Sequence, residues 1–210
     1  MKNLKITLLL VGLFLFPIIG LANDVIKDDP EQNISETEFQ TRRLEMVEKQ
    51  IRKRGIRDRV ILDSFRKVPR HRFVPEDLKY LAYNDHPLPI GEAQTISQPY
   101  IVAFMTEALN LSRSDKILEI GTGSGYQAAI LGELCDSVFT IEIIASLGNR
   151  AKLLLEELDY QNIKVKICQF LLQHICYLLN LQKQTHVLQH PQYYLILMKT
   201  NHQLFLVSYI

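Results

Sequence analysis

The sequence predicts an α/β protein with a parallel sheet, a helical layer ahead of the sheet, and an incomplete C-terminal part. Short apolar runs alternate with helical segments between residues 117 and 167, an order typical of parallel sheets. Two amphipathic segments precede this region. Every glycine and every acidic residue lies before Cys168. The second half of an α/β domain needs glycine turns and acidic helix caps as much as the first half does.

Length and composition are those of one globular domain. The chain has 210 residues, of which 47% are hydrophobic and 22% are charged, and its formal net charge is +1. This charge gives no sign of electrostatic binding to nucleic acid. The cysteines at 135, 168 and 176 fit neither a disulfide framework nor a recognised zinc pattern.

Residues 1–22 predict a signal peptide. Lys2 and Lys5 form a positive segment, an uncharged apolar run covers 6–19, and Gly20-Leu21-Ala22 supplies the small residues of a cleavage site. The run is shorter than the ~20 residues that span a bilayer, so no stable membrane span is expected after cleavage. The alternative is an uncleaved anchor. Residues 23–34 predict a linker. The expected location is periplasmic or secreted, with cytoplasmic as the alternative.

Two helices are expected at the start of the folded domain, which is predicted to cover residues 35–167. Ser35 and Glu38 fit a capping box at the first helix, and Gly55 is expected to end it. The apolar residues of that helix are predicted to share one face: Leu44, Val47 and Ile51. A second short helix carries Val60, Ile61 and Phe65 and is predicted to end before Pro69.

Residues 84–100 (NDHPLPIGEAQTISQPY) predict a long loop. The segment has three prolines, one glycine and little hydrophobic periodicity, and long loops in compact domains are often functional. Ser97 precedes a helix expected from about Tyr100, so it is either a helix cap or a functional hydroxyl. No His or Asp has the sequence context of a hydrolase triad partner, and GTGSG is not a G-x-S-x-G elbow.

The stretch ILEIGTGSGYQAAIL (117–131) predicts a ligand site. A strand over 117–120 ends at three glycines that let the chain turn and a ligand approach the backbone: Gly121, Gly123 and Gly125. A helix over 126–134 begins there with free amides. A second strand over 138–143 carries Glu142, placed like an acid that accepts hydrogen bonds from a ribose. A helix over 145–158 and a strand over 163–167 follow.

The glycine spacing excludes two nucleotide-binding motifs. A P-loop needs a Lys-Ser/Thr pair after its glycines, and none is present. In the dinucleotide pattern G-x-G-x-x-G the third glycine comes one residue later than Gly125, which disfavours an NAD-binding module.

Three separated motifs resemble the protein-L-isoaspartate O-methyltransferases: VPRHRFVP, LPIGEAQTISQPYIVAFMTEAL and ILEIGTGSGYQAAIL. The resemblance covers about residues 40–167. It implies a Rossmann-like S-adenosylmethionine-dependent methyltransferase sheet with an N-terminal helical layer. It also implies an enzyme of protein repair, which methylates the misplaced carboxylate of L-isoaspartyl residues.

The resemblance also implies the site. The implied cofactor is S-adenosyl-L-methionine, and the cofactor-binding residues are Thr95, Glu119, Gly121, Thr122, Gly123, Gly125 and Glu142. The implied catalytic residue is Ser97. The implied partners are isoaspartyl-containing proteins and peptides, and we expect a monomer that binds no nucleic acid and no metal. A carboxylate acceptor is already ionised at neutral pH, so positioning can replace a strong base.

The resemblance stops after Ile167. The family continues with a Gly-Asp-Gly turn near the adenine and a strand resembling FDAIIVTAA. The last 43 residues of this chain instead contain no glycine and no acid, and they hold four of the six histidines. Out-of-frame translation is the favoured explanation of residues 168–210. The alternatives are a divergent tail and a metal site made from Cys168, Cys176, His186 and His190.

The tail bears on both structure and activity. We expect loosely helical structure after residue 167 and an exposed apolar edge on the sheet, since parallel strands need cover on both faces. The activity of this chain is therefore doubtful. The alternative function is an inactive cofactor- or protein-binding remnant of the family.

Overall fold

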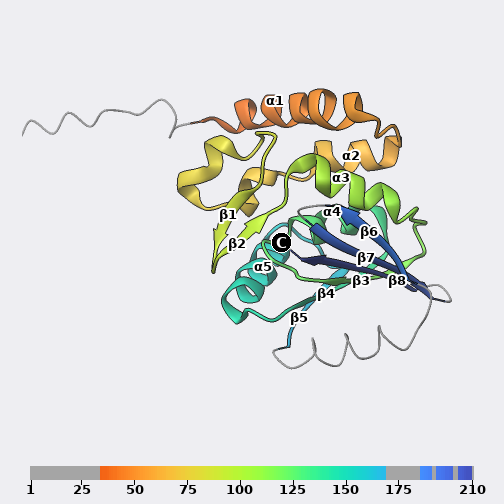
Figure 1. Ribbon diagram of the computed structural model, residues 1–210. Helices are drawn as coiled ribbons and strands as arrows, with labels where there is room; N and C mark the ends of the chain where they lie inside the picture. Colours follow the sequence, from red (N-terminus) through yellow and green to blue (C-terminus); the bar gives the residue numbers. More distant parts are fainter. Residues whose placement is uncertain (1–33, 169–184, 191–192, 201–202, 210) are drawn as a thin grey trace, which may run out of the picture.

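The structure, a computed structural model, describes residues 34–168 and three further segments, 185–190, 193–200 and 203–209. The predicted signal peptide (1–22) and all but the last residue of the predicted linker (23–34) lie outside these ranges. Within the described ranges, no helix is both long and apolar enough to cross a membrane. A helical layer lies over an α/β layer, as Figure 1 shows.

The N-terminal layer begins with a helix that changes type along its length. Its consecutive pieces are α1 (Glu36–Met46), the π-helical η1 (Val47–Ile51) and the 3₁₀ turn η2 (Arg52–Arg54). The hydroxyl of Ser35 accepts a 3.2 Å hydrogen bond from the amide of Glu38, which confirms the serine half of the predicted capping box; the carboxylate of Glu38 accepts hydrogen bonds from Arg42 instead. Gly55 ends the helix at a φ of 111°, a conformation that favours glycine.

The buried face of α1 differs from the predicted one by a residue. Leu44, expected to pack inward, is 43% exposed, whereas Val47 and Ile51 are fully buried. The inward residues of α1 are instead Phe39, Arg43 and Met46. Their spacing of four and three residues defines a helical face, and Leu44 lies just outside it.

The second helix, α2 (Arg59–Lys67), ends before Pro69 as predicted. The carboxylate of Asp58 caps it by accepting hydrogen bonds from the amides of Val60 and Ile61. Two 3₁₀ segments follow, η3 (Arg70–Phe73) and η4 (Glu76–Leu81).

The predicted loop at 84–100 contains a β-hairpin that the sequence did not reveal. Strands β1 (Leu88–Gly91) and β2 (Gln94–Ile96) pair antiparallel. They are too short for hydrophobic periodicity to show. Glu92 and Ala93 turn the hairpin at φ values of 56° and 55°, without the Asn-Gly or Asp-Gly pair that marks such turns.

Helix α3 (Pro99–Ala108) shows that Ser97 is not a helix cap. The N-cap residue is Gln98, and no side chain makes a capping hydrogen bond. Pro99 occupies the first turn, where its fixed φ suits the start of a helix. The interpretation of Ser97 as a cap is therefore wrong.

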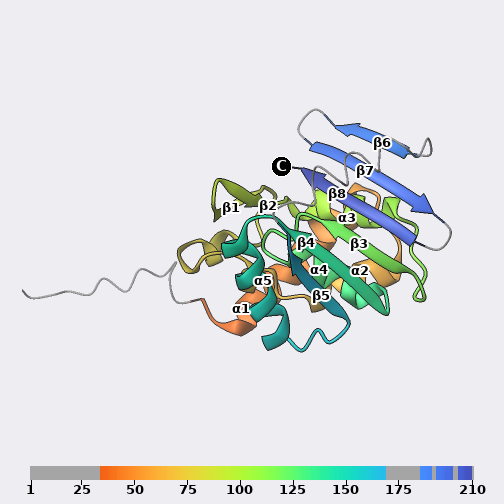
Figure 2. The same cartoon turned by 90° about the horizontal axis from the view of Figure 1, so that it is seen from below.

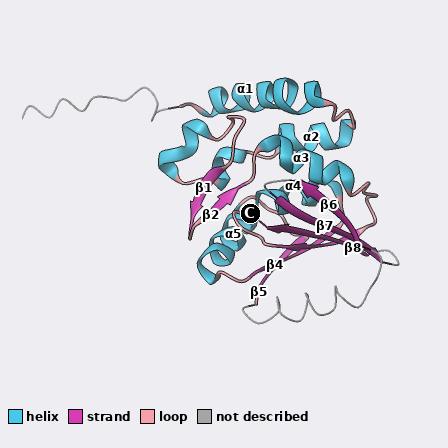
Figure 3. Cartoon of the chain, viewed as in Figure 1, coloured by secondary structure: helices cyan, strands magenta, loops and turns pink. Residues whose placement is uncertain are grey.

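The α/β layer follows the predicted order. Its elements are β3 (Lys116–Ile120), α4 (Tyr126–Leu134), β4 (Ser137–Glu142), α5 (Ala145–Glu157) and β5 (Ile163–Ile167). Strand β4 pairs parallel with both β3 and β5, which confirms the α/β class. In Figure 3 the helices lie on one side of these strands.

The tail corrects two expectations. In its described segments it forms strands where loosely helical structure was expected: β6 (Thr185–His190), β7 (Tyr193–Thr200) and β8 (Gln203–Tyr209). The sheet order is β5-β4-β3-β8-β7-β6, with β8 parallel to β3, so the edge of β3 is paired rather than exposed (Figure 2). An open parallel edge presents unpaired backbone groups, and segments such as QLFLVSY have strong β propensity. Of the residues in the metal-site alternative, Cys176 lies outside the described ranges.

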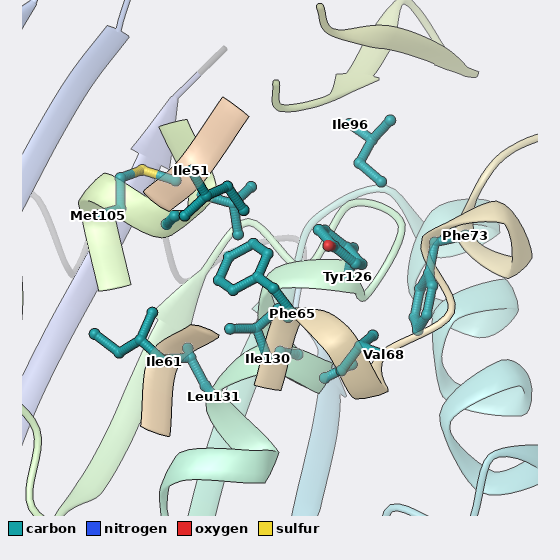
Figure 4. Close-up of a cluster of buried hydrophobic side chains, with 14 of the residues drawn as sticks. Ile51, Ile61, Phe65, Val68, Phe73, Ile96, Met105, Tyr126, Ile130 and Leu131 are labelled. Carbon is teal, nitrogen blue, oxygen red and sulfur yellow. The ribbon is translucent and has the colours of Figure 1, made fainter. Parts of the chain in front are cut away.

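The core joins the two layers at Tyr126, the first residue of α4. Its ring, 1% exposed, meets Phe65 of α2 edge-on at a centroid distance of 6.2 Å and Phe73 of η3 at 5.5 Å (Figure 4). Aromatic pairs prefer this geometry. The helix that starts at the glycine stretch is therefore fixed by the N-terminal layer.

Candidate functional site

The centre of the candidate site is the turn between β3 and α4, here called the glycine loop (residues 121–125). Gly121, Gly123 and Gly125 have φ values of 96°, 53° and 87°. Side chains rarely tolerate this left-handed region, so the loop needs glycine at alternate positions. The amide of Gly121 donates a 2.8 Å hydrogen bond to the carbonyl of Ile141 on the next strand. The loop is thus tied to the sheet while α4 begins directly after it.

Glu142, at the end of β4, holds the loop in place. One carboxylate oxygen accepts a 2.8 Å hydrogen bond from the amide of Gly123. The other accepts hydrogen bonds of 2.9 Å from the amides of Ile143 and Ile144. Glu142, predicted as a ribose acceptor, thus lies at the loop as expected.

Glu119 lies under the loop and is fully buried. One carboxyl oxygen accepts a hydrogen bond from the hydroxyl of Thr140, and that hydroxyl is 2.7 Å from the hydroxyl of Thr122. The other oxygen has no partner within the described ranges. Burial, aided by the nearby charge of Glu142, raises the pKa of Glu119 to about 8, although the hydrogen bond from Thr140 opposes the rise. Thr140 was missed in the sequence because nothing there separates it from an ordinary strand threonine.

The hairpin β1–β2 covers one side of the glycine loop. A Cβ placed on Gly123 would meet only the Cδ1 of Ile90, at 3.6 Å. The guanidinium of Arg150 on α5 donates a 2.7 Å hydrogen bond to the carbonyl of Ile90, and Ser146 donates to Glu92 at the hairpin tip. A cavity of about 230 Å³ lies here, lined in part by Ile90, Gly123 and Arg150. These contacts place the predicted loop against the glycines.

The two hydroxyl residues of the hairpin region lie beside this cover. Thr95 lies in β2, and its hydroxyl is buried without a hydrogen-bond partner in the described part of the chain. Ser97 follows β2 and is 9% exposed. Its carbonyl accepts a 2.8 Å hydrogen bond from Arg70, whose guanidinium also lies over the ring of Tyr126. The structure therefore connects Ser97 to the start of α4 through one side chain, which the sequence did not predict.

The arrangement suits a ligand that carries positive charge. Two acidic side chains, Glu119 and Glu142, flank the same loop, and in the described residues neither forms an ion pair with a Lys, Arg or His. An unpaired buried carboxyl is costly, so a cation would be favoured beside it.

Comparison with known proteins identifies relatives over this part of the chain. The statistical description of the family "Protein-L-isoaspartate(D-aspartate) O-methyltransferase (PCMT)" matches residues 41–169. A protein-L-isoaspartate O-methyltransferase of Syntrophus aciditrophicus is 58% identical over 129 residues, which are 61% of this chain and 59% of that protein. Protein-L-isoaspartate O-methyltransferase 1 of Syntrophobacter fumaroxidans is 59% identical over 129 residues, 61% of this chain and 60% of that protein.

A solved structure supports the fold. A Plasmodium falciparum protein described as a protein-L-isoaspartate O-methyltransferase, in complex with S-adenosyl-L-homocysteine, superimposes with a TM-score of 0.58 at 16% identity. The match covers 80% of this chain and 94% of that one. This chain spans about three fifths of the length of the two bacterial relatives. The matched region contains the glycine loop, Glu119, Glu142, Thr95 and Ser97.

Proposed function

The chain belongs to the protein-L-isoaspartate(D-aspartate) O-methyltransferase family, and on this premise we propose that its glycine loop binds S-adenosyl-L-methionine. We further propose that the acceptor is the carboxylate of an L-isoaspartyl residue in a damaged protein or peptide, oriented beside Ser97. Support comes from the names of the two relatives, which are 58% and 59% identical to this chain over the 129 matched residues. The proposed reaction is methylation of that carboxylate, a reaction of protein repair.

The observation that carries the proposal is the pair of acids at the glycine loop. S-adenosyl-L-methionine carries an ammonium and a sulfonium, and positive charge near the loop would interact favourably with Glu142 and with the unpartnered oxygen of Glu119. The amides at the start of α4 face the same loop. Gly123 has space beside it, since only Ile90 would contact a Cβ there. The bound cofactor supplies a methyl group that its positive charge makes electrophilic.

The acceptor side needs positioning more than proton transfer. A carboxylate is ionised at neutral pH, so the chain need not supply a strong base. Holding the acceptor in line with the methyl group removes much of the entropic barrier. Ser97 caps no helix and is itself 9% exposed. Its hydroxyl is therefore free to donate a hydrogen bond to the acceptor carboxylate.

We propose that the 210-residue chain does not turn over, because its tail replaces a segment that the reaction needs. The family match ends at residue 169, close to Ile167, where the motif resemblance stops. The alternative is that the chain acts as an inactive remnant that binds the cofactor or a protein. Both alternatives predict no turnover, so selective binding of an isoaspartyl peptide separates them.

The experiment uses two peptides that differ only in an isoaspartyl or aspartyl linkage. With S-adenosyl-L-homocysteine present, we expect the chain to bind the isoaspartyl peptide at least about tenfold more tightly, because a positioned hydroxyl discriminates geometry. Equal affinities would contradict the acceptor assignment. Transfer of labelled methyl groups should be undetectable. A robust rate would show that the tail suffices and would contradict only the proposed inactivity.

Export is a separate proposal that rests on residues 1–22. The charged segment, apolar run and small-residue end favour cleavage after Ala22, which would place the mature chain in the periplasm or outside the cell. N-terminal sequencing should find Asn23. An intact Met1 in a soluble fraction would favour the cytoplasmic alternative.

A further inference from the structure

Arg70 is a buried cation that the proposed function leaves unexplained. Among the residues whose burial the structure describes, it is the largest fully buried side chain, with 0% exposure. Within the described ranges it forms no ion pair, and one of its terminal nitrogens has no hydrogen-bond partner. Burial lowers its pKa to about 10, so the guanidinium is still charged at neutral pH.

The contacts of Arg70 join three separate segments of the chain. Its Nε donates a 2.7 Å hydrogen bond to the carbonyl of Ala82. A terminal nitrogen donates a 2.8 Å hydrogen bond to the carbonyl of Ser97. The guanidinium carbon lies 4.8 Å from the centroid of the Tyr126 ring. Arg70 thus contacts Ser97, the residue proposed to orient the acceptor, and Tyr126, the first residue after the glycine loop.

Stability alone does not account for a charge in this place. Taking a guanidinium out of water is costly, and an apolar side chain of similar size often replaces a buried charge without loss. Two carbonyls and one aromatic face compensate only part of that cost. What an apolar side chain cannot do is donate to the carbonyl of Ser97. The rigid fork of an arginine can hold two carbonyls at fixed positions at once.

We propose that Arg70 is a positioning residue for the acceptor site. By holding the Ser97 carbonyl and packing on Tyr126, it fixes the Ser97 backbone relative to the glycine loop. The Ser97 hydroxyl then meets the acceptor carboxylate at a constant distance from the cofactor. The inference rests on the proposed function, because it needs Ser97 to contact the acceptor.

A second set of contacts fixes the segment around Ser97. The side chain of Gln98 donates to the backbone and the carboxylate of Asp85 at 3.0 and 2.7 Å. That carboxylate also accepts from Arg54. The chain around Ser97 is therefore tied from both sides, from the interior by Arg70 and from the surface by Asp85.

The first test is spectroscopic and needs no activity. Ser97-Gln98 is the only Ser-Gln pair in the sequence, so labelling serine with ¹³C at the carbonyl and glutamine with ¹⁵N gives one correlated resonance. In the full chain, Arg70→Met should move the Ser97 carbonyl resonance upfield, as expected for a lost hydrogen bond. Arg113→Met is the matched control, because Arg113 also donates to a backbone carbonyl, that of Glu133. An unchanged resonance in Arg70→Met overturns the inference.

The second test is a double-mutant cycle on acceptor binding. With S-adenosyl-L-homocysteine present, Arg70→Met should weaken binding of the isoaspartyl peptide about tenfold when Ser97 is intact, and less than about twofold in the Ser97→Ala background. Cofactor affinity should change little. Equal losses in both backgrounds would show that Arg70 does not act through Ser97 and would overturn the inference.

Two further arms keep the outcome decisive. Arg70→Lys keeps the charge but cannot hold both carbonyls, so it should fold and give an intermediate loss. It replaces Arg70→Met in both tests if that variant fails to fold, and wild-type behaviour of Arg70→Lys would then overturn the inference. If the unmodified chain binds no isoaspartyl peptide, the proposed function fails and the inference with it. If only the inference fails, the unmodified chain still binds the isoaspartyl peptide, and the Arg70 variants bind it equally well.

Discussion

At the scale of single residues, the site is distinguished by acids that lack cations. Glu119 and Glu142 flank the glycine loop from adjacent strands, and one of them is buried with an unpartnered oxygen. Within the described residues, that oxygen accepts no hydrogen bond. Such a group costs stability and is commonly found where a ligand binds.

Glu119 gives a prediction on stability and pH. Its pKa rises from an ordinary 4.5 to about 8 through burial. Because the pKa of Glu119 is raised in the folded state, its contribution to the free energy of unfolding is complete below pH 4.5 and is lost as the pH rises through about 8. Glu119→Gln removes this loss, so its free energy of unfolding relative to the wild type should increase by roughly 3–4 kcal/mol between pH 5 and pH 8.

Urea unfolding at the two pH values measures the effect of Glu119→Gln. A matched exchange at the exposed Glu107 removes the same charge from the surface and serves as the control. A difference from the wild type that is equal at pH 5 and pH 8 would contradict the account of Glu119.

Ser97 gives a second prediction. Because it caps no helix, Ser97→Ala should lower the free energy of unfolding by clearly less than the ~1 kcal/mol of a lost cap. Binding of the isoaspartyl peptide should nevertheless weaken. Thermal melting and peptide titration together check this. A loss of about 1 kcal/mol with unchanged peptide binding would mean that the hydroxyl is structural.

The positions of the candidate site residues were only partly predictable from the sequence. Gly121, Gly123 and Glu142 could be predicted because their spacing follows from a strand, a tight turn and a helix. Arg70 and Ile90 could not, because they reach the site through contacts between segments distant in sequence. No periodicity or motif spacing reports such contacts.

At the scale of elements, the regular α/β part was predictable and the hairpin was not. The bounds of α4 and β5 agree with the prediction, since α4 follows the glycines directly and β5 alternates apolar residues with lysines. The turn of the hairpin lacks an Asn-Gly or Asp-Gly pair, and α5 contacts the hairpin through Glu92 and the carbonyl of Ile90. Likewise, α1 buries Phe39 rather than Leu44. The buried face of a helix depends on the elements that pack against it, and the sequence alone does not show these.

The hairpin turn gives a third prediction. Ala93 has a φ of 55°, where a Cβ is strained. Ala93→Gly should therefore raise the free energy of unfolding by ~0.5–1 kcal/mol. Ala108→Gly, at an exposed position of α3, should lower it by a similar amount because glycine weakens helices. Denaturant unfolding of the two variants checks the opposite signs, and a stability loss in Ala93→Gly would contradict the strained turn.

The tail strands show where composition misleads. The absence of glycine and acid suggested collapse without regular elements, yet β8 pairs parallel with β3 along five residues. Backbone pairing with an open edge requires neither glycine nor charge. The composition remains unusual, and the family match still ends at residue 169.

At the scale of the whole molecule, the chain joins a family domain to a tail of different character. A fourth prediction concerns the origin of that tail. If the reading frame changed near codon 167, another frame of the downstream DNA should encode a Gly-Asp-Gly turn followed by a strand resembling FDAIIVTAA. Sequencing the gene checks this. A downstream region without family-like sequence in any frame would mean that the tail is a true divergence.

The central claim is that the glycine loop binds S-adenosyl-L-methionine, and calorimetric titration of the full chain tests it most directly. The account predicts one binding site, abolished by Gly123→Val and weakened by ~1–3 kcal/mol in Glu142→Ala through loss of hydrogen bonds to a charged group. Gly55→Val is the matched control, since Gly55 also has positive φ and lies in open space away from the loop; it should keep wild-type affinity. Absence of binding to the wild type, or equal affinity in Gly123→Val, would contradict the claim.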